Sequence, residues 1–241
     1  LMSNIYLIKK GATNCSLNNI YTNEKIEVAL SPVLTPVENA QSYYKRYNKY
    51  KRAVEEIIKQ RQETNELLEY LQSLDSSLQT ASNKTEVAEI RQELINEGII
   101  SENKKGKSKS SLPKSVPLSI SLSQETIIYV GKNNKQNDFV TFSIAKPHDL
   151  WFHAKGFPGS HVILRTTLPK PTEAEIARAA KIAAYFSKAR NSSNVPVDCT
   201  EKRFVKKPSG AKPGFVIYTN QQTLYVTPDF GSIDNTLTHH D

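Results

Sequence analysis

Hydrophobic residues recur at intervals of three and four from position 37 to about position 80, which predicts one long amphipathic helix. Neither Gly nor Pro interrupts this stretch. A helix of that length is typical of one arm of a coiled coil, so we expect it to need a partner helix. The apolar positions are Val54, Ile57, Ile58, Leu67, Leu68, Leu71, Leu74 and Leu78.

The segments on either side of the long helix contain shorter predicted elements. Residues 1–34 contain apolar runs at 5–8 and 25–30 that predict strands of a small, partial subdomain. After a break at Asn83, a short apolar stripe predicts a second helix that Gly98 ends as a C′ glycine. We expect this helix to fold back on the long one, which gives a coiled-coil segment over residues 35–98.

From residue 119 the pattern is that of a compact domain with several strands and one main helix. Strands are predicted at 126–130, 139–144, 149–154 and 162–165, and again at 195–197, 203–205, 216–218 and 223–226. Thr172 and Glu175 form a capping box that begins an Ala-rich helix running to about Ala189. The fold class is therefore α+β: a long antiparallel-type coiled-coil arm followed by a compact mixed α/β domain at 119–230. Residues 99–118 are interpreted as a basic flexible linker and 231–241 as a disordered tail.

The charge of the chain favours an anionic partner. Its formal net charge is +8, and between Ser119 and Phe230 there are 15 Lys and Arg against 8 Asp and Glu. A basic domain of this kind attracts polyanions, nucleic acid first.

The two cysteines, Cys15 and Cys199, are too far apart in sequence to indicate a zinc site or a disulfide framework, so we expect reduced thiols in a cytoplasmic protein. No membrane span or signal peptide is visible, and because the chain opens on Leu1 in mid-pattern we expect a fragment of a longer protein.

Candidate chemistry gathers at residues 149–161, which hold the only Trp of the chain. Asp149, Trp151 and His153 alternate, so their side chains share one face of an extended strand. Metal-ligand spacing, nucleophile elbows, phosphate loops and dinucleotide-binding glycines are all missing. We therefore expect no catalytic residue, no metal and no cofactor. Asp149 is interpreted as a hydrogen-bond partner of a backbone amide or of a His, with a hydrogen bond that fixes the His153 ring preferred over a catalytic pair.

Binding of RNA fits this composition better than catalysis. Planar side chains can stack on bases, while Lys and Arg meet phosphates. The alternative for Trp151 is packing in the core, because a lone Trp is usually buried. A second run of Tyr and basic residues, from 43 to 52, suits either RNA stacking or the solvated flank of a coiled coil. The RNA-binding candidates are Asp149, Trp151, His153, Lys155, Pro158, Gly159, Ser160, His161, Lys132, Asn133, Asn134, Asn137, Arg165, Lys206, Lys207 and Lys212.

Six blocks of sequence also resemble the NFACT-R domain of the NFACT family, the RqcH-type ribosome quality control factors that are also called the fibronectin-binding protein A family. The blocks are YVGKNNKQND, DLWFHA, PGSHV, AAKIAAYFSKAR, VPVDCT and KPGFVIY, in that order over residues 129–218. The segment from 36 to 47 is similar to the start of that family's returning coiled-coil helix. Residues 1–34 are similar to its middle subdomain.

The resemblance implies a function in ribosome-associated quality control. Members of the family bind large ribosomal subunits that carry peptidyl-tRNA, and recruit tRNA, chiefly alanyl-tRNA, for template-free C-terminal alanine tailing. The family's Asp-Trp-His motif falls on Asp149, Trp151 and His153, which the resemblance marks as a tRNA-related site. From the resemblance we expect three parts of the family pattern to be missing from this stretch of sequence: the NFACT-N domain, the helix-hairpin-helix region and the outgoing coiled-coil helix. The partner helix is thus expected from the missing N-terminal part. The alternative function is a fibronectin-binding, adhesin-like interaction module.

Overall fold

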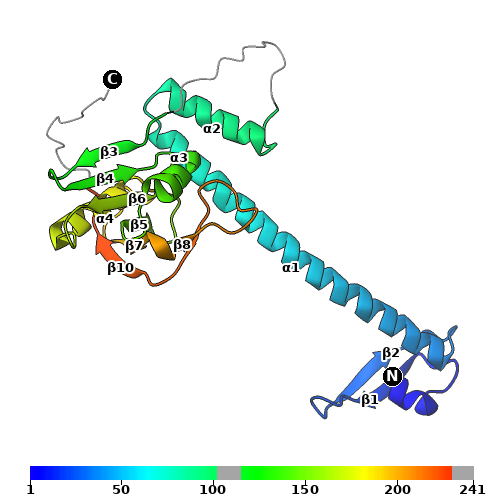
Figure 1. The fold of residues 1–241 in the computed structure, drawn as a ribbon. Coiled ribbons are helices and arrows are strands. Elements are labelled where there is room, and N and C mark those ends of the chain that lie inside the picture. The colour runs from blue at the N-terminus through cyan, green and yellow to red at the C-terminus, as the bar shows by residue number, and fades with distance from the viewer. Residues whose placement is uncertain (102–114, 230–241) are drawn as a thin grey trace. The chain divides into compact units, whose positions relative to one another are not determined.

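The computed structural model describes residues 1–101 and 115–229, which divide into two compact units, Leu1–Glu66 and Leu67–Asp241 (Figure 1). The division falls inside the long helix α1 (Pro36–Thr80). Most of the predicted linker and the whole predicted tail lie outside the described residues.

The first unit consists of a 3₁₀ helix, a two-stranded sheet and the beginning of α1. Antiparallel strands β1 (Asn14–Asn18) and β2 (Lys25–Ala29) form the sheet, and Tyr43 of α1 donates a hydrogen bond to the Ala29 carbonyl (2.7 Å). The strand predicted at residues 5–8 is wrong, because the helix η1 (Met2–Leu7) occupies that stretch. Thr35 and Glu38 begin α1 with reciprocal hydrogen bonds, the capping-box arrangement.

The second unit is built on a six-stranded antiparallel sheet in the order β10-β7-β5-β6-β4-β3. The strands are β3 (Leu118–Ser121), β4 (Thr126–Val130), β5 (Leu150–Ala154), β6 (Val162–Thr166), β7 (Val195–Glu201) and β10 (Gln222–Val226). A separate two-stranded sheet pairs β8 (Val205–Lys206) with β9 (Ile217–Tyr218). The mixed α+β fold with a long helix is confirmed, but the structure describes no second helix along α1 up to Glu66 that would make a coiled-coil arm.

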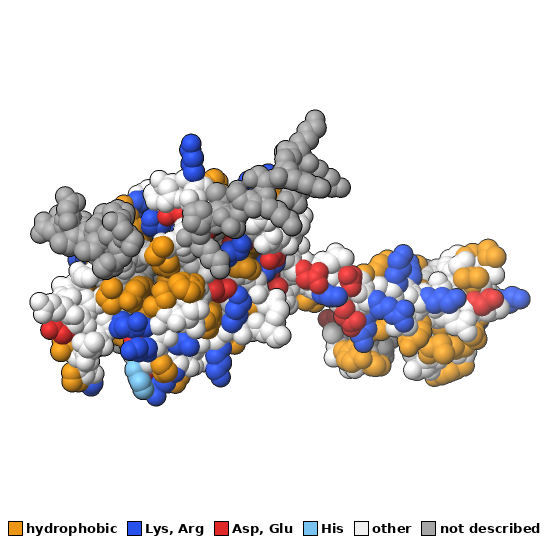
Figure 2. Space-filling view, turned by 45° about the horizontal axis from the view of Figure 1, so that its top comes forward, with side chains coloured by type: hydrophobic (Ala, Val, Ile, Leu, Met, Phe, Trp, Pro, Cys, Tyr) orange, Lys and Arg blue, Asp and Glu red, His pale blue; other side chains and the backbone are white. Residues whose placement is uncertain are grey.

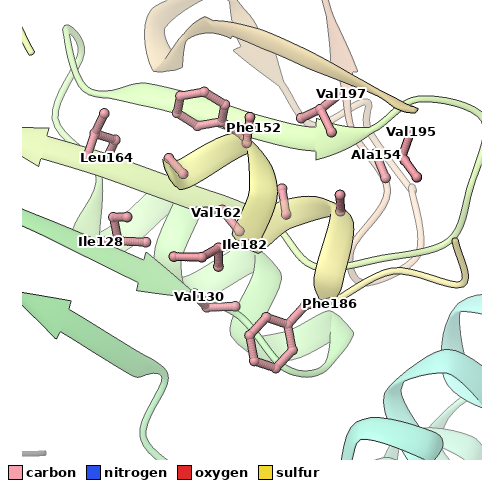
Figure 3. Packing of buried hydrophobic residues seen from close by; sticks show 14 of the residues in the cluster. Ile128, Val130, Phe152, Ala154, Val162, Leu164, Ile182, Phe186, Val195 and Val197 are labelled. Carbon is pink, nitrogen blue, oxygen red and sulfur yellow. The ribbon is translucent and has the colours of Figure 1, made fainter. Parts of the chain in front are cut away.

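One face of the sheet packs on helix α4 (Glu173–Tyr185), which the Thr172–Glu175 capping box begins as predicted. Figure 3 shows Ile182 of α4 beside Val130 and Val162 of the sheet. Alanines on the same helix face are fully buried, which lets the helix lie close to the strands. The helix ends at Tyr185 rather than near Ala189, and the next residues turn back toward the sheet.

The opposite face of the sheet is covered by residues for which the sequence predicted a strand. Residues 139–144 are wrong as a strand: helix α3 (Asn134–Phe139) runs into a π-helical turn, η2 (Val140–Ile144). Asn133 caps α3 by accepting a hydrogen bond from the Gln136 amide (2.8 Å). Val140 and Thr141 are buried as in a strand, but they belong to helical backbone that packs on the sheet.

Helix α2 (Lys84–Asn96) packs against the end of α1, as predicted from its apolar stripe. Tyr70, Leu74 and Ile90 form the buried contact between them. Asn83 is the cap of α2, accepting from the Glu86 amide, and Gly98 adopts a positive φ of 69° just after the C-cap. The prediction that the second helix folds back on the first is confirmed within the second unit.

Candidate nucleic-acid interface

Trp151 lies in the core and has no exposed surface. Strand β5 holds it between Ile163 of β6 and Thr200 of β7. Its ring stacks on His153 (5.7 Å between centroids, 14° between planes) and meets the rings of His161 (5.1 Å) and Tyr218 (4.8 Å). These neighbours cover the indole, so core packing, the alternative left open by the sequence, is the arrangement that the structure has. The indole Nε1 is buried without a hydrogen-bond partner among the described residues.

Asp149 does not bind His153, so that interpretation is wrong, whereas the alternative of a backbone amide is what the structure has. The carboxylate is buried and its Oδ2 accepts hydrogen bonds from the Lys146 amide (2.8 Å) and from Arg165 Nε (2.9 Å). Arg165 also donates to the Ile144 carbonyl. Two of the predicted RNA-binding residues, Asp149 and Arg165, therefore neutralise each other and fix the turn that leads into β5.

The two imidazoles of the predicted site are neutral at physiological pH. Burial lowers the pKa of His153 to about 4, against the opposing effect of the Asp198 carboxylate across the strand pair. Burial also lowers the pKa of His161 well below its usual value, with a further lowering from His153. His161 Nδ1 lies 2.8 Å from Thr141 Oγ1, and its backbone amide donates to Asn137 Oδ1 (2.9 Å). Neither ring supplies positive charge to a phosphate.

Asp198 organises a polar cluster beside His153. Its carboxylate is buried and accepts hydrogen bonds from Tyr218 Oη (2.9 Å) and Thr223 Oγ1 (2.5 Å). Burial raises the pKa of the Tyr218 hydroxyl, and the adjacent carboxylate raises it further. Lys155 Nζ lies 3.6 Å from the same carboxylate, but half of its side chain stays exposed. Among the predicted cations, Lys155 is thus only partly engaged within the chain.

The turn that begins at Lys132 faces helix α2 instead of solvent. Asn133, Asn134 and Asn137 are all buried, so they do not present free amides to RNA. Three consecutive residues of the turn contact three carboxylates on one face of α2: Lys132 with Glu86 (3.2 Å), Asn133 with Glu89 (2.8 Å) and Asn134 with Glu93 (3.0 Å). Burial raises the pKa of Glu93, although hydrogen bonds from Asn134 and Tyr70 act against it. This polar interface joins the helical hairpin to the sheet domain.

Most of the Gly- and Pro-rich loop after β8 is also held by contacts within the chain. Lys207 pairs with Asp138, and Lys212 Nζ lies 3.7 Å from Glu97 Oε2 and 4.3 Å from the centre of the Tyr70 ring. Gly214 has a positive φ of 79°, and a Cβ there would approach Asn134 Oδ1 to 2.6 Å. Lys206 is exposed and forms no ion pair within residues 1–101 and 115–229.

The turn from Pro158 to Ser160 supports the end of α4. The Pro158 carbonyl accepts from the Lys188 amide and the Ser160 amide donates to the Phe186 carbonyl, both at 2.9 Å. A Cβ on Gly159 would lie 2.8 Å from the Cβ of Ser187, so only Gly allows this close approach. These predicted site residues have structural contacts in place of a free surface.

Of the RNA-binding residues predicted from the sequence, Lys155 and Lys206 are therefore the exposed cations available to a phosphate. The exposed imidazole of His148 was not among the predicted residues. The side chain of His148 is 79% exposed, and its Nδ1 lies 3.0 Å from Glu201 Oε2. The run Lys146-Pro147-His148 could have indicated this residue, because it places a cation and a planar ring just before β5. It was missed because it lies outside the strand in which Asp149, Trp151 and His153 alternate.

Neither a metal site nor a membrane span emerges from the described part of the chain. Within residues 1–101 and 115–229, His, Cys, Asp and Glu form no cluster that could hold a metal ion. No helix in the same ranges is long and apolar enough to cross a bilayer.

The basic antiparallel sheet domain joined to a helical hairpin has clear counterparts among known proteins. Residues 1–112 match the family described as NFACT N-terminal and middle domains, and residues 119–220 match the NFACT protein RNA binding domain. The chain belongs to the NFACT family, which confirms the resemblance seen in its sequence motifs.

Individual relatives extend over nearly the whole chain. It is 43% identical over 237 residues to "Rqc2 homolog RqcH" of Bacillus subtilis strain 168, a match that covers 97% of this chain and 41% of that protein. A protein of the same name from Streptococcus pneumoniae strain R6 is 46% identical over 213 residues, covering 88% and 38%. The chain thus spans about 41% or less of the length of these relatives.

A solved structure supports the fold. The C-terminal part of the fibronectin/fibrinogen-binding protein from Streptococcus suis is similar with a TM-score of 0.73 and 44% identity. The match covers 83% of this chain and 79% of that one.

Proposed function

We propose that this chain is the RNA-binding part of a ribosome-associated quality control factor. The observation that carries the proposal is the match of the basic domain, residues 119–220, to the NFACT RNA-binding domain. The relatives named RqcH, at 43% and 46% identity, support the same assignment.

In this proposal the chain recruits tRNA, chiefly alanyl-tRNA, to a large ribosomal subunit that carries peptidyl-tRNA, so that alanine is added without a template. It acts in the cytoplasm and by binding, not by catalysis. Two features support a binding role: an excess of Lys and Arg over the domain, and His153 and His161 rings too poorly basic to act as general bases near neutral pH. Phosphates are contacted by exposed cations such as Lys155 and Lys206.

The exposed apolar stripe of α1 supports a second part of the proposal, a coiled-coil arm. Val54, Ile57 and Ile58 are each more than half exposed, which is unusual for three neighbouring aliphatic residues on one helix. We propose that a second helix covers this stripe and makes the coiled-coil arm, and that the tyrosines at positions 47 and 50, which continue the stripe, pack on the same helix.

Filter binding of alanine tRNA to the chain at two salt concentrations tests the proposal. Binding through three or four phosphates should weaken about 40- to 150-fold between 50 and 200 mM salt, since each contact releases counterions. Failure to retain tRNA at the lower salt concentration would reject it.

The second candidate function is binding of fibronectin, favoured by the name of the Streptococcus suis protein. Immobilised fibronectin in place of tRNA, tested with the same protein preparation, separates the two functions. Binding to fibronectin without binding to tRNA would favour the second.

A further inference from the structure

The chain has a small pocket on the second unit where β5 begins and β6 ends. It has a volume of about 100 Å³. Leu150 and Leu164, opposite each other in the β5–β6 register, contribute apolar lining, and Leu168, Pro169 and Pro171 of the segment before α4 contribute the rest. Cofactor and drug sites are usually about 300–1,000 Å³. This pocket therefore suits the edge of a single flat ring.

Most polar groups of the pocket are already occupied. Asp149 is held by Arg165, and Thr166 Oγ1 receives hydrogen bonds from Thr126 Oγ1 (2.9 Å) and the Leu168 amide (3.1 Å). His148 differs, because Glu201 contacts only its Nδ1 and its Nε2 has no partner among the described residues. The pocket thus offers an exposed planar ring with one free nitrogen beside an apolar hollow.

The segments that form the pocket are basic. Lys146 and Lys170 are exposed, and neither forms an ion pair with a described residue. Three carboxylates beside these segments are engaged: Asp149 with Arg165, Glu201 with His148 and Arg203, and Glu175 with the Thr172 cap. Glu173, at the start of α4, is exposed and has no partner among the described residues. Figure 2 shows Lys and Arg side chains beside hydrophobic ones on this unit. The surroundings of the pocket therefore attract an anionic ligand, while its interior accepts an apolar ring.

We infer that this pocket binds one unpaired nucleobase of RNA. The inference deepens the proposed function and rests on it. The base stacks on the His148 ring with its edge over Leu168 and the two prolines, while Lys146 and Lys170 meet the flanking phosphates. A base inside an A-form helix cannot reach such a pocket, so the site selects single strands, loops or ends. The buried Trp151 takes no part.

Fluorescence anisotropy with the full chain tests the inference, using a short single-stranded oligoribonucleotide and a duplex of the same length. His148→Ala should weaken binding of the single strand about tenfold, in line with the loss of one stacked base. His148→Phe, which keeps a flat ring, should stay within about twofold of the wild-type protein. Binding of the duplex should not change.

Two control variants test whether a loss of binding comes from the His148 ring itself. Glu201→Gln removes the negative charge beside His148 but leaves the ring, so binding of the single strand should not weaken. Tyr21→Ala removes an exposed aromatic ring from the other unit, where the side chain is 90% exposed, and should also have no effect. A thermal melt confirms that each variant is folded, which we expect because His148 is largely exposed.

The outcomes keep this inference distinct from the proposed function. Wild-type affinity of His148→Ala for the single strand would overturn the pocket while leaving RNA binding intact. An equal loss in His148→Phe, or in Tyr21→Ala, would overturn stacking at this site. Absence of RNA binding by the wild-type chain would reject the proposed function and the pocket with it.

Discussion

Replacing Trp151 separates a structural role from a role in RNA binding. The indole is fully buried and packs against Val140, Ile163 and Val205, so Trp151→Ala leaves a large cavity. Truncations of this kind cost about 3–5 kcal/mol. The loss of the stacking contact with His153 acts in the same direction.

Trp151→Phe is the matched variant. It keeps an aromatic ring and removes the indole Nε1, which has no hydrogen-bond partner in the described structure. An unsatisfied buried donor costs about 1–3 kcal/mol, so its removal offsets part of the smaller cavity. We expect Trp151→Phe to lose no more than about 2 kcal/mol.

Hydrogen exchange of the β5 and β7 backbone amides measures these effects in the second unit alone. Amides in Trp151→Ala should open with a free energy lower by about 3–5 kcal/mol, and RNA affinity of the fraction that remains folded should be unchanged. The exposed Tyr225, changed to Ala, controls for loss of an aromatic ring as such. A Trp151→Ala protein with wild-type exchange but about tenfold weaker RNA binding would refute the reasoning.

Three further results are expected. Because the pKa of His153 is lowered to about 4, the unfolded chain takes up the proton first, so this group should contribute about 3 kcal/mol to the loss of stability as pH drops from about 6.5 to 4. His161, whose pKa burial also lowers, adds to the fall, so the measurement is the difference between the wild-type protein and His153→Gln in a denaturation series. An equal fall in the two proteins would contradict this. Asn134→Ala should lower protection of the α2 amides by about 2–3 kcal/mol, since it leaves Glu93 short of a buried hydrogen bond, and unchanged exchange would show that the contact is dispensable. Lys206→Gln should reduce the salt dependence of RNA binding by about one phosphate contact. Lys207→Gln, which removes a cation already paired with Asp138, should have a smaller effect, and the reverse order would contradict the assignment.

Local signals in the sequence were sufficient for much of the fold. The Thr172–Glu175 capping box and Gly98 after α2 lie where they were expected, because each depends only on neighbouring residues. Residues 139–144 were predicted as a strand because β-branched and aromatic side chains are common on any buried surface. The helix that forms instead begins at the Asn133 cap, several residues earlier in the sequence.

The site was harder to predict, since it depends on contacts between distant parts of the chain. Asn133 and Asn134 have the composition of an exposed turn, and only the position of α2, more than 40 residues earlier, shows that they are buried. Charge counts misled in the same way: Arg165 and Lys132 add to the basic total, but each faces a carboxylate. His148 was missed because exposure cannot be inferred from a single imidazole between a Pro and an Asp.

The dissociation constant of the chain for alanine tRNA, measured across a series of salt concentrations, tests the central claim most directly. RNA binding to three or four phosphates through exposed cations such as Lys155 and Lys206 predicts a log–log slope of about −2.7 to −3.6. A slope near zero, or no binding at the lowest salt, would contradict the account.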